Sequence, residues 1–440
     1  MTGALPGYKG KAAEALQRAG VSVGDNVRIT REGKVYEGTL FPRSEYSDDS
    51  HIVLKLKNGY NLGIEVTQGT TIEFLSKGVK PEFVSPPRPE QDPQLPKVSI
   101  VSTGGTIASR VDYRTGAVQP ALSAEDLHSF VPELSNIARI NATILFSEFS
   151  ENIGPKQWRE MAATAAKEIK SGAQGVIFSH GTDTMGYTAA ALSFCLRNLP
   201  VPIILVGSQR SSDRPSSDAA SNLIAATTIA SKAPFAEVVL VMHEANSDDY
   251  ISIHRGTRVR KCHTSRRDAF QTIGTGPLGR VDLKSLQVQL STDDFQKRDV
   301  KEDPQVLAGF DETVALLKFH PSFNPEIIDW LREKKCHGIV LEGTGLGHVG
   351  RACFSSIRKA VDSGILIAMT SQCVWGMVDM NVYETGRDLL AMGVIPLGDM
   401  ITETAYVKMM WVLGQTKDMT KAREMMTTPM AYEFAERRVL

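Results

Sequence analysis

Two hydroxyl-rich turns contain the residues of this chain that are best suited to chemistry. The turn at 103–106 reads Thr-Gly-Gly-Thr, and the turn at 181–184 reads Gly-Thr-Asp-Thr. Each directly follows a short apolar run, at 98–101 and 175–178, with the length and β-branched content of a strand buried on both faces. Ligands of open α/β sheets bind where parallel strands end, so the two turns predict one shared catalytic floor.

The first turn offers a hydroxyl next to closely approachable backbone. Thr103 stands at the predicted strand end, where its hydroxyl is placed to attack a carbonyl, and the paired glycines can aim N–H groups at a developing oxyanion. A Gly/Thr-rich turn is also a common way to pass from strand to helix. No Gly-Lys-Ser/Thr follows it, which argues against a phosphate-binding loop.

The second turn adds a carboxylate. Thr182 supplies another hydroxyl, and Asp183 is suited to hold a substrate ammonium group or to orient a base. The structural alternative is a helix N-cap, in which Thr182 or Asp183 caps a helix that begins near Met185. Both roles are compatible, because capping also places these groups at the carboxyl edge of the sheet.

A hydroxyl nucleophile needs an adjacent base, and neither turn contains a lysine. The segment 258–267 reads Arg-Val-Arg-Lys-Cys-His-Thr-Ser-Arg-Arg, and Lys261 in it is the candidate base once it is desolvated. The residues alone fit a solvated basic loop, or a patch that binds RNA phosphates, better than a catalytic base.

Neither a metal ion nor a cofactor is expected in this chain. The nine histidines show no metal-binding spacing, and the five cysteines contain no C-x-x-C pair, so we expect reduced thiols. The glycine-rich stretch 343–350 does not match the dinucleotide-binding pattern with its distant acidic residue.

Composition narrows the possible locations and partners. The chain has 440 residues with 49 basic and 50 acidic side chains, so no global field recruits nucleic acid. No apolar run approaches the length of a membrane span, and the N-terminus lacks a signal-like segment. We expect a cytoplasmic protein that does not associate with a membrane.

The chain is expected to contain three domains and a linker. Strand-like segments at 25–30, 34–40, 51–56 and 71–74 predict a small β-barrel-like domain over 1–80, after a short helix at 11–19. The proline-rich stretch 81–96 is the predicted linker. Alternating strands and helices predict α/β domains with parallel sheets over 97–305 and 306–440.

The expected elements of these two domains follow the hydrophobic pattern. In the first domain we expect strands at 98–102, 143–147, 175–179, 201–206 and 237–242, and helices at 123–131, 155–170, 185–198 and 217–231. In the second we expect strands at 313–319, 338–342 and 364–369, and helices at 324–335, 350–361, 383–392, 401–414 and 420–440.

With these residues in view, the chain from Lys97 to about Tyr432 resembles the L-asparaginase/glutaminase family of two-domain amidohydrolases. The runs Thr-Gly-Gly-Thr-Ile-Ala from Thr103 and His-Gly-Thr-Asp-Thr-Met from His180 are similar to its two threonine motifs, and the segment around Lys261 is similar to its lysine motif. The resemblance implies an α/β, two-domain asparaginase-like fold with parallel sheets, preceded here by the small N-terminal β-barrel domain.

The resemblance also implies a role for each site residue. Thr103 would attack the side-chain amide as nucleophile, while Thr182, Asp183 and Lys261 would form a second hydroxyl, carboxylate and base group. The order in which the two threonines attack stays open. Tyr113 would match a tyrosine on the family's mobile lid.

A substrate-clamping loop is implied at Ser150-Glu151. These two residues would hold the α-carboxylate and α-amino groups of glutamine or asparagine. Glu151 stands where some family members have glutamine, which leaves the choice between the two substrates open.

The N-terminal portion resembles a further branch of the family, the asparaginase-like components of archaeal-type tRNA-dependent amidotransferases. That resemblance implies a component that releases ammonia from glutamine for a kinase-like, tRNA-binding partner, the E subunit. The partner would bind ATP and Mg²⁺ and most of tRNA(Gln), and would amidate Glu-tRNA(Gln) to Gln-tRNA(Gln). A homodimeric core is also implied.

Two other functions remain open at this stage. One is a free-standing cytoplasmic L-asparaginase that carries an incidental N-terminal module. The other is a non-enzymatic amino-acid-binding or RNA-binding protein that uses the basic segment 254–267.

Overall fold

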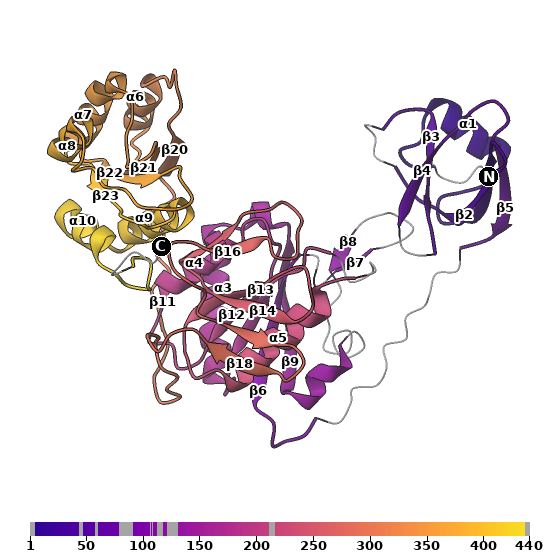
Figure 1. The fold of residues 1–440 in the computed structure, drawn as a ribbon, viewed down its shortest axis with the longest axis horizontal. Coiled ribbons are helices and arrows are strands. Elements are labelled where there is room, and N and C mark those ends of the chain that lie inside the picture. The colour runs from indigo at the N-terminus through magenta and orange to yellow at the C-terminus, as the bar shows by residue number, and fades with distance from the viewer. Residues whose placement is uncertain are drawn as a thin grey trace.

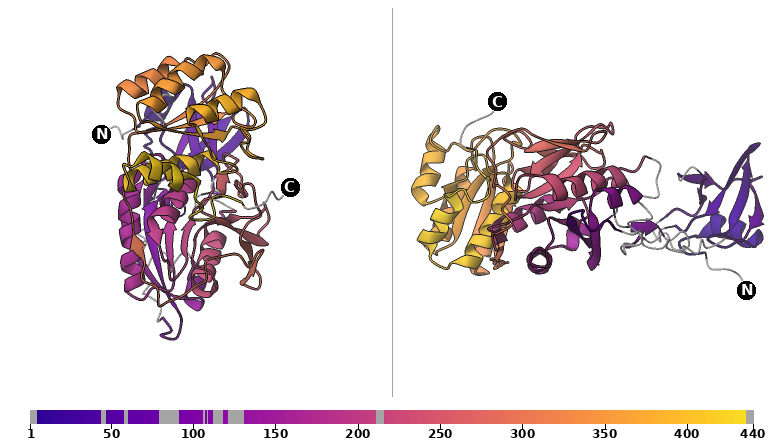
Figure 2. Two further views of the ribbon diagram at one scale, coloured as in Figure 1. Left: turned by 90° about the vertical axis from the view of Figure 1, so that its left-hand side faces the viewer. Right: turned by 90° about the horizontal axis from the view of Figure 1, so that it is seen from below.

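The structure is a computed structural model, and it describes residues 5–43, 47–57, 60–78, 91–105, 107, 109–111, 118–120, 131–210 and 216–435. Figure 1 shows three groups of elements, with the N-terminal group set apart from the other two, and Figure 2 shows the same order from two further sides. In the described residues, no helix combines the length and the apolar character needed to cross a membrane.

The N-terminal group is a five-stranded antiparallel sheet in the order β4-β3-β2-β1-β5. Its apolar side chains alternate along the strands, and they enclose a small core with the helix; Val27, Ile29 and Leu54 are fully buried in it. The elements are α1 (Gly10–Arg18), β1 (Asn26–Arg31), β2 (Lys34–Leu40), β3 (His51–Lys55), β4 (Asn61–Glu65) and β5 (Thr71–Ser76). The predicted small β-domain is confirmed, and β4 is a strand that the hydrophobic pattern did not predict.

The central group is built on an eight-stranded sheet in the order β18-β17-β14-β13-β12-β10-β6-β9. The strands β9, β6, β10, β12 and β13 run parallel, and β14, β17 and β18 add antiparallel strands at one side. The strands of this sheet are β6 (Lys97–Gly104), β9 (Arg139–Glu148), β10 (Val176–Ser179), β12 (Ile203–Val206), β13 (Val238–His243), β14 (Tyr250–Arg255), β17 (Gly279–Asp282) and β18 (Gln287–Leu290).

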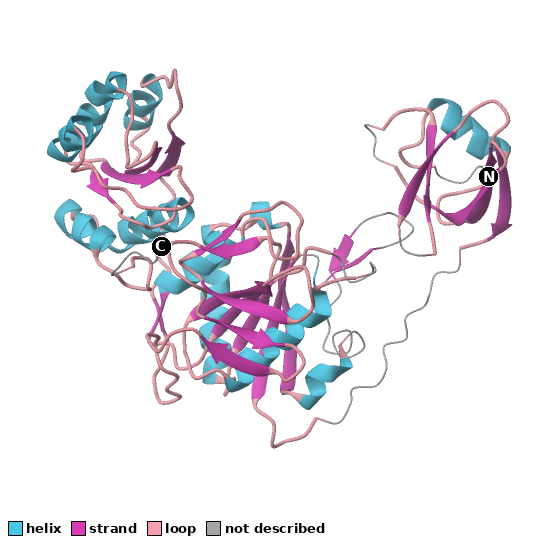
Figure 3. Ribbon diagram, viewed as in Figure 1, coloured by secondary structure: helices cyan, strands magenta, loops and turns pink. Residues whose placement is uncertain are grey.

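Helices cover both faces of this sheet, as Figure 3 shows. Phe178 and Leu205 pack with α3 and α4 on one face, while Ile177 and Ile204 pack with α5 on the other. The buried strands therefore read as continuous apolar runs. The helices and short elements are α3 (Pro155–Lys170), α4 (Met185–Cys195), α5 (Ala219–Lys232), η2 (Pro132–Asn136), η3 (Ser150–Asn152), β7 (Ser109–Val111), β8 (Val118–Pro120), β11 (Leu196–Arg197), β15 (Val259–Lys261), β16 (Phe270–Thr272) and β19 (Gln305–Val306).

The C-terminal group is a four-stranded parallel sheet in the order β20-β21-β22-β23. One face packs on α6, α7 and α8, and the other packs on α9 and α10. Its elements are β20 (Val314–Lys318), α6 (Glu326–Glu333), β21 (Gly338–Gly343), η4 (Arg351–Cys353), α7 (Phe354–Asp362), β22 (Leu366–Ser371), α8 (Glu384–Met392), β23 (Ile395–Pro396), α9 (Thr402–Gln415) and α10 (Met419–Thr427).

One continuous core joins the central and C-terminal groups. Helix α4 lies against α9, and the Phe194 and Trp411 rings stack with centroids 5.9 Å apart. Aromatic pairs of this kind contribute beyond their buried area. The central and C-terminal groups are thus packed against each other through large apolar side chains.

Two predicted helices are longer than the structure allows. The helix expected at 185–198 ends at Cys195, because Leu196–Arg197 forms a short antiparallel pair with Gln305–Val306. The helix expected at 420–440 ends at Thr427, two residues before Pro429, since the residue before a proline is disfavoured in helical conformation. The helix expected at 123–131 lies outside the described residues, apart from Val131.

Candidate active site

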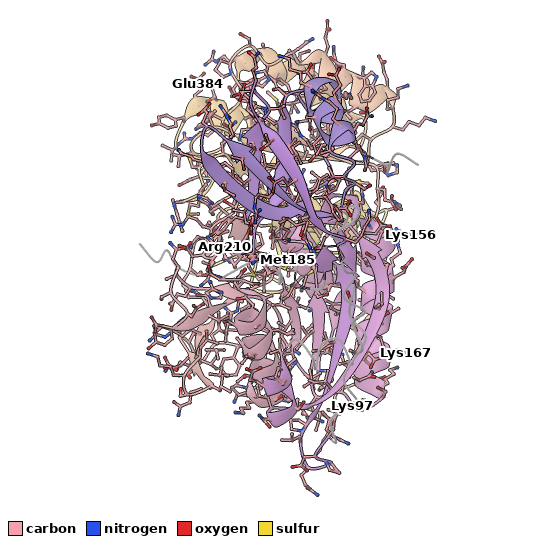
Figure 4. All side chains as sticks on the ribbon, turned by 90° about the vertical axis from the view of Figure 1, so that its right-hand side faces the viewer. Lys97, Lys156, Lys167, Met185, Arg210 and Glu384 are labelled. Atoms are coloured by element: carbon pink, nitrogen blue, oxygen red, sulfur yellow. The ribbon has the colours of Figure 1, made fainter. Side chains whose placement is uncertain are left out.

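The two hydroxyl-rich turns lie side by side because the strands that precede them pair in register. Ser102 at the end of β6 is the partner of Ser179 at the end of β10. In Figure 4, Met185, just after the second turn, and Arg210, after β12, lie toward the opposite end of the domain from Lys97, where β6 begins. The carboxyl edge of the parallel strands therefore holds both turns, as the sequence predicted.

The backbones of the two turns are in direct contact. Gly105 has a φ of +83°, and a methyl group placed on it would lie 2.6 Å from the Gly181 nitrogen. A methyl group placed on Gly207, after β12, would lie 2.8 Å from the Thr182 methyl group. Only glycine permits this approach. The first turn is thereby held within one residue of Thr182.

This contact gives a first prediction, for Gly105→Ala. The added methyl group meets backbone atoms, so the two turns must separate, and we expect amide hydrolysis to fall by about 100-fold. The matched control is Gly172→Ala, which carries similar positive-φ strain, at +91°, but meets nothing within 4 Å. Steady-state hydrolysis rates of Gly105→Ala and Gly172→Ala are then compared. Equal rates would show that the contact between Gly105 and Gly181 is not needed for activity.

Lys261 joins the second turn and forms the centre of the site. Its Nζ lies 2.8 Å from the Thr182 Oγ1 and 2.7 Å from the Asp183 Oδ1. The Lys261 side chain is only 13% exposed, whereas the Asp183 side chain is 72% exposed. A shielded amine beside a hydroxyl, with a carboxylate that orients it, is an arrangement that can move a proton to and from that hydroxyl.

Thr103 lies beneath this group and not in the open. Its side chain is fully buried, and its Oγ1 donates a 2.7 Å hydrogen bond to the Ser179 carbonyl. A hydroxyl that is buried and already committed to a backbone acceptor cannot meet a substrate carbonyl. The prediction that Thr103 attacks the amide is therefore at odds with this geometry, which gives Thr103 a role in joining β6 to β10.

The predicted substrate clamp adjoins the second turn. Ser150 and Glu151 lie in η3, and the Ser150 carbonyl accepts a 2.5 Å hydrogen bond from the Thr184 hydroxyl. A methyl group on Gly181 would lie 2.8 Å from the Ser150 Cβ, so Ser150 is next to the turn, while Glu151 is exposed. Tyr113 lies outside the described residues.

A buried hydrogen-bond chain behind the second turn was not foreseen from the sequence. His180 is fully buried, with its Nδ1 2.7 Å from the Gly181 carbonyl and its Nε2 2.9 Å from the Thr188 Oγ1. The Thr188 Oγ1 also accepts from the Trp158 Nε1 at 3.1 Å. A carbonyl can only accept, so the Nδ1 carries the proton and the Nε2 accepts from Thr188. The chain fixes the backbone from which Thr182 projects.

This chain of hydrogen bonds gives a second prediction, on how the stability of the protein depends on pH. Burial lowers the pKa of His180 from 6.5 to about 4, so the folded protein binds fewer protons than the unfolded chain between these values. The contribution of His180 to the free energy of unfolding is therefore fully present above pH 6.5. It is lost as the pH falls from 6.5 toward 4, by up to about 3 kcal/mol. Burial also lowers the pKa of His254 to about 4, so His254 too should make the protein less stable as the pH falls.

Urea unfolding at pH 7.5 and pH 5 measures this effect. The free energy of unfolding should be lower at pH 5, and His180→Gln should reduce the difference between the two values. An equal pH dependence in the wild type and in this variant would contradict the assignment.

The basic segment is neutralised within the fold. Ion pairs join Arg258 to Asp399, Arg260 to Glu403, Arg266 to Asp268 and Arg267 to Asp248, with N–O distances of 2.7, 3.2, 2.5 and 2.7 Å respectively. Cations that already have carboxylate partners offer less to phosphates. This pairing disfavours the reading of 254–267 as an RNA-binding patch. In the described residues, no group of three His, Cys, Asp or Glu side chains is arranged to hold a metal ion.

Comparison with known proteins defines the class first. Models of the asparaginase N-terminal domain and of the glutaminase/asparaginase C-terminal domain match residues 97–294 and 313–426. The thermostable L-asparaginase of Thermococcus kodakarensis has a TM-score of 0.70 and 31% identity, covering 78% of this chain and 100% of its own. L-asparaginase I of Vibrio cholerae has a TM-score of 0.68 and 25% identity, covering 78% and 99%. The fold is that of the asparaginase/glutaminase class.

The N-terminal domain and the full-length relatives define the family within that class. The model of the GatD N-terminal domain matches residues 21–75. The D subunit of glutamyl-tRNA(Gln) amidotransferase from Methanopyrus kandleri is 49% identical over 99% of this chain and 96% of its own, and that from Pyrococcus furiosus is 50% identical over 96% and 97%. The chain belongs to the GatD family, the D subunits of glutamyl-tRNA(Gln) amidotransferase, and is thus one component of an amidotransferase enzyme.

Proposed function

We propose that this chain hydrolyses the side-chain amide of glutamine and delivers ammonia to a partner protein. The partner, the kinase-like, tRNA-binding E subunit, would use that ammonia with ATP and Mg²⁺ to convert Glu-tRNA(Gln) to Gln-tRNA(Gln). The observation that carries the proposal is the group formed by the Lys261 amine, the Thr182 hydroxyl and the Asp183 carboxylate. The name shared by the full-length relatives supports the tRNA-dependent setting.

The chemistry follows from the need to make a threonine hydroxyl nucleophilic. The Lys261 amine accepts the hydroxyl proton as the oxygen attacks the amide carbon, and Asp183 holds the amine in place. Backbone N–H groups of the paired glycine turns stabilise the oxyanion. The C–N bond then breaks, the nitrogen takes the proton and leaves as ammonia, and water hydrolyses the acyl-threonine to release glutamate.

The proposal departs from the sequence-based assignment in the attacking hydroxyl. Thr103 is buried and bonded to Ser179, so we propose Thr106, the other threonine of the same turn, as the nucleophile. Thr106 lies outside the described residues. The proposal rests on Gly105, whose backbone contacts Gly181, because consecutive Cα atoms are only about 3.8 Å apart. Thr182 then relays the proton to Lys261.

Substrate recognition is proposed to use the loop beside the second turn. The exposed carboxylates of Glu151 and Asp183 suit the α-ammonium group of an amino acid, and the backbone next to Ser150, whose own side chain is buried, suits the α-carboxylate. Tyr113 is proposed to close over the bound amide. A homodimeric core remains part of the proposal, and ATP and Mg²⁺ are assigned to the partner.

Partner dependence tests the proposal against a free-standing L-asparaginase. The full chain is assayed for ammonia release from glutamine and from asparagine, alone and assembled with the E subunit, ATP and Glu-tRNA(Gln). We expect hydrolysis of glutamine to rise strongly on assembly. Vigorous asparagine hydrolysis by the chain alone, unchanged by partner and tRNA, would favour the asparaginase instead.

A further inference from the structure

Lys261 does not lie in the sheet that carries Thr182. It ends β15, a three-residue strand that pairs with β16 in a separate two-stranded sheet. The turn that bears Thr182 follows β10 of the eight-stranded sheet. No strand pairing in the described residues joins the two sheets, so other contacts must hold the Lys261 amine within 2.8 Å of the Thr182 hydroxyl.

The C-terminal domain supplies these contacts just before β15. The Thr404 hydroxyl donates to the Thr257 carbonyl at 2.8 Å. Arg258, only 1% exposed, donates from its Nη1 to the Asp399 Oδ2 at 2.7 Å and from its Nε to the Tyr432 carbonyl at 2.9 Å. Buried, charge-assisted bonds of this kind fix a segment firmly. The approach to β15 is therefore anchored on α9, on the preceding loop and on the C-terminal tail.

The closest of these contacts to Lys261 is made by the residue beside it. The Arg260 Nε lies 3.2 Å from the Oε1 of Glu403 on α9. The Arg260 side chain is 29% exposed and the Glu403 side chain is 15% exposed. Successive side chains of a strand point to opposite faces, so Arg260 faces α9 while Lys261 faces Thr182. The Arg260–Glu403 pair thus holds the strand from the side opposite to the chemistry.

Among the charged neighbours that favour the ionised Glu403, Arg260 has the largest effect, ahead of Lys318. Its Oε2 is buried and has no hydrogen-bond partner in the described part of the chain. Burial raises the pKa of Glu403, and the neighbouring Arg260 opposes that rise. A desolvated carboxylate holds a paired guanidinium strongly, because removing the guanidinium leaves a buried negative charge with less compensation.

We infer that Arg260 and Glu403 are positioning residues that aim the Lys261 amine at Thr182 and Asp183, so that the C-terminal domain sets the geometry of the catalytic base. The inference rests on the proposed function and goes beyond it by naming residues outside the reacting group. The substrate clamp, in η3 before α3, does not depend on this pair. Loss of the pair therefore acts on turnover and leaves glutamine binding intact.

The test compares variants in the assembled amidotransferase, with glutamine as the amide donor. Arg260→Gln and the isosteric Glu403→Gln should each lower kcat about 100-fold, the usual effect of displacing a catalytic group by about 1 Å, with KM changed less than about twofold. Arg260→Lys keeps the charge but not the planar fork, and should recover part of kcat. Amidation with added ammonia reports whether the assembly is intact.

The matched control is Arg159→Gln. The Arg159 Nη2 on α3 lies 3.2 Å from the Glu312 Oε1, in the segment that leads into β20, so this variant removes another ion pair between the same two domains that is made from α3 and not from β15. We expect it to keep nearly full kcat. The same kcat in Arg260→Gln and Arg159→Gln, or a raised KM at unchanged kcat, would overturn the inference. A wild type that releases no ammonia from glutamine would instead overturn the proposed function.

If Glu403→Gln fails to fold, Arg260→Lys still decides the matter. It keeps the ion pair's charge while shortening the reach of the donor, so the inference requires a kcat between those of the wild type and Arg260→Gln, again at unchanged KM. A wild-type kcat in Arg260→Lys together with a wild-type kcat in Arg260→Gln would refute the positioning role.

Discussion

Lys261→Met is expected to abolish glutamine-dependent formation of Gln-tRNA(Gln) while leaving amidation with added ammonium chloride at the wild-type rate. The methionine side chain fills nearly the same volume, but it can neither accept the threonine proton nor bond to Thr182 and Asp183. Loss of a catalytic base lowers turnover by about 100- to 10,000-fold. Parallel assays with glutamine and with ammonia as nitrogen donor give the comparison.

The ammonia reaction makes this a test of chemistry and not of folding. A variant that fails to fold or to assemble loses both reactions, whereas loss of the base removes only the first. Glutamine-dependent amidation that persists in Lys261→Met at more than about a tenth of the wild-type rate would exclude Lys261 as the base.

The second large effect separates the three threonines. Thr182→Val keeps the shape of the side chain and removes the hydroxyl that Lys261 contacts, so we expect hydrolysis of glutamine to fall at least about 100-fold. Thr106→Val should lower the hydrolysis of glutamine by the same amount, because it removes the proposed nucleophile. Thr103→Val should retain activity within about tenfold, while the free energy of unfolding drops by about 1 kcal/mol through loss of the bond to Ser179.

Mass spectrometry of acid-quenched enzyme identifies the acylated residue directly. With glutamine as substrate, the glutamyl mass should lie on the peptide that contains Thr106, and cleavage within that peptide should place it on Thr106 itself. A glutamyl group on Thr103, or an inactive but folded Thr103→Val variant, would restore Thr103 as the nucleophile.

Much of the scaffold is readable from the sequence, because its signals are local. The helix predicted at 155–170 coincides with α3, and the apolar runs at 98–102 and 175–179 are β6 and β10. The antiparallel strands β14, β17 and β18 were not foreseen. β14 and β18 alternate polar and apolar residues, but each has only two aliphatic side chains and β17 has one, which is a weak signal beside the continuous apolar runs of the parallel strands.

The site was readable to the level of motifs, but not of individual roles. Thr182, Asp183 and Lys261 were selected by residue type, and the structure brings them together. The inward-facing position of the Thr103 hydroxyl at a strand end has no signal in the sequence, where Thr103 and Thr106 have the same chemistry. The Arg260–Glu403 pair joins residues on different domains, and such pairing has no local signal.

The most direct measurement follows the amide nitrogen itself. Glutamine labelled with ¹⁵N at the side-chain amide is supplied to the assembled enzyme with ATP and Glu-tRNA(Gln), and the glutaminyl group is recovered from the tRNA and weighed. We predict that the wild type transfers ¹⁵N into Gln-tRNA(Gln), and that Lys261→Met transfers none while still incorporating ¹⁵N from labelled ammonium. Transfer of ¹⁵N from glutamine by Lys261→Met, or none by the wild type, would contradict the account.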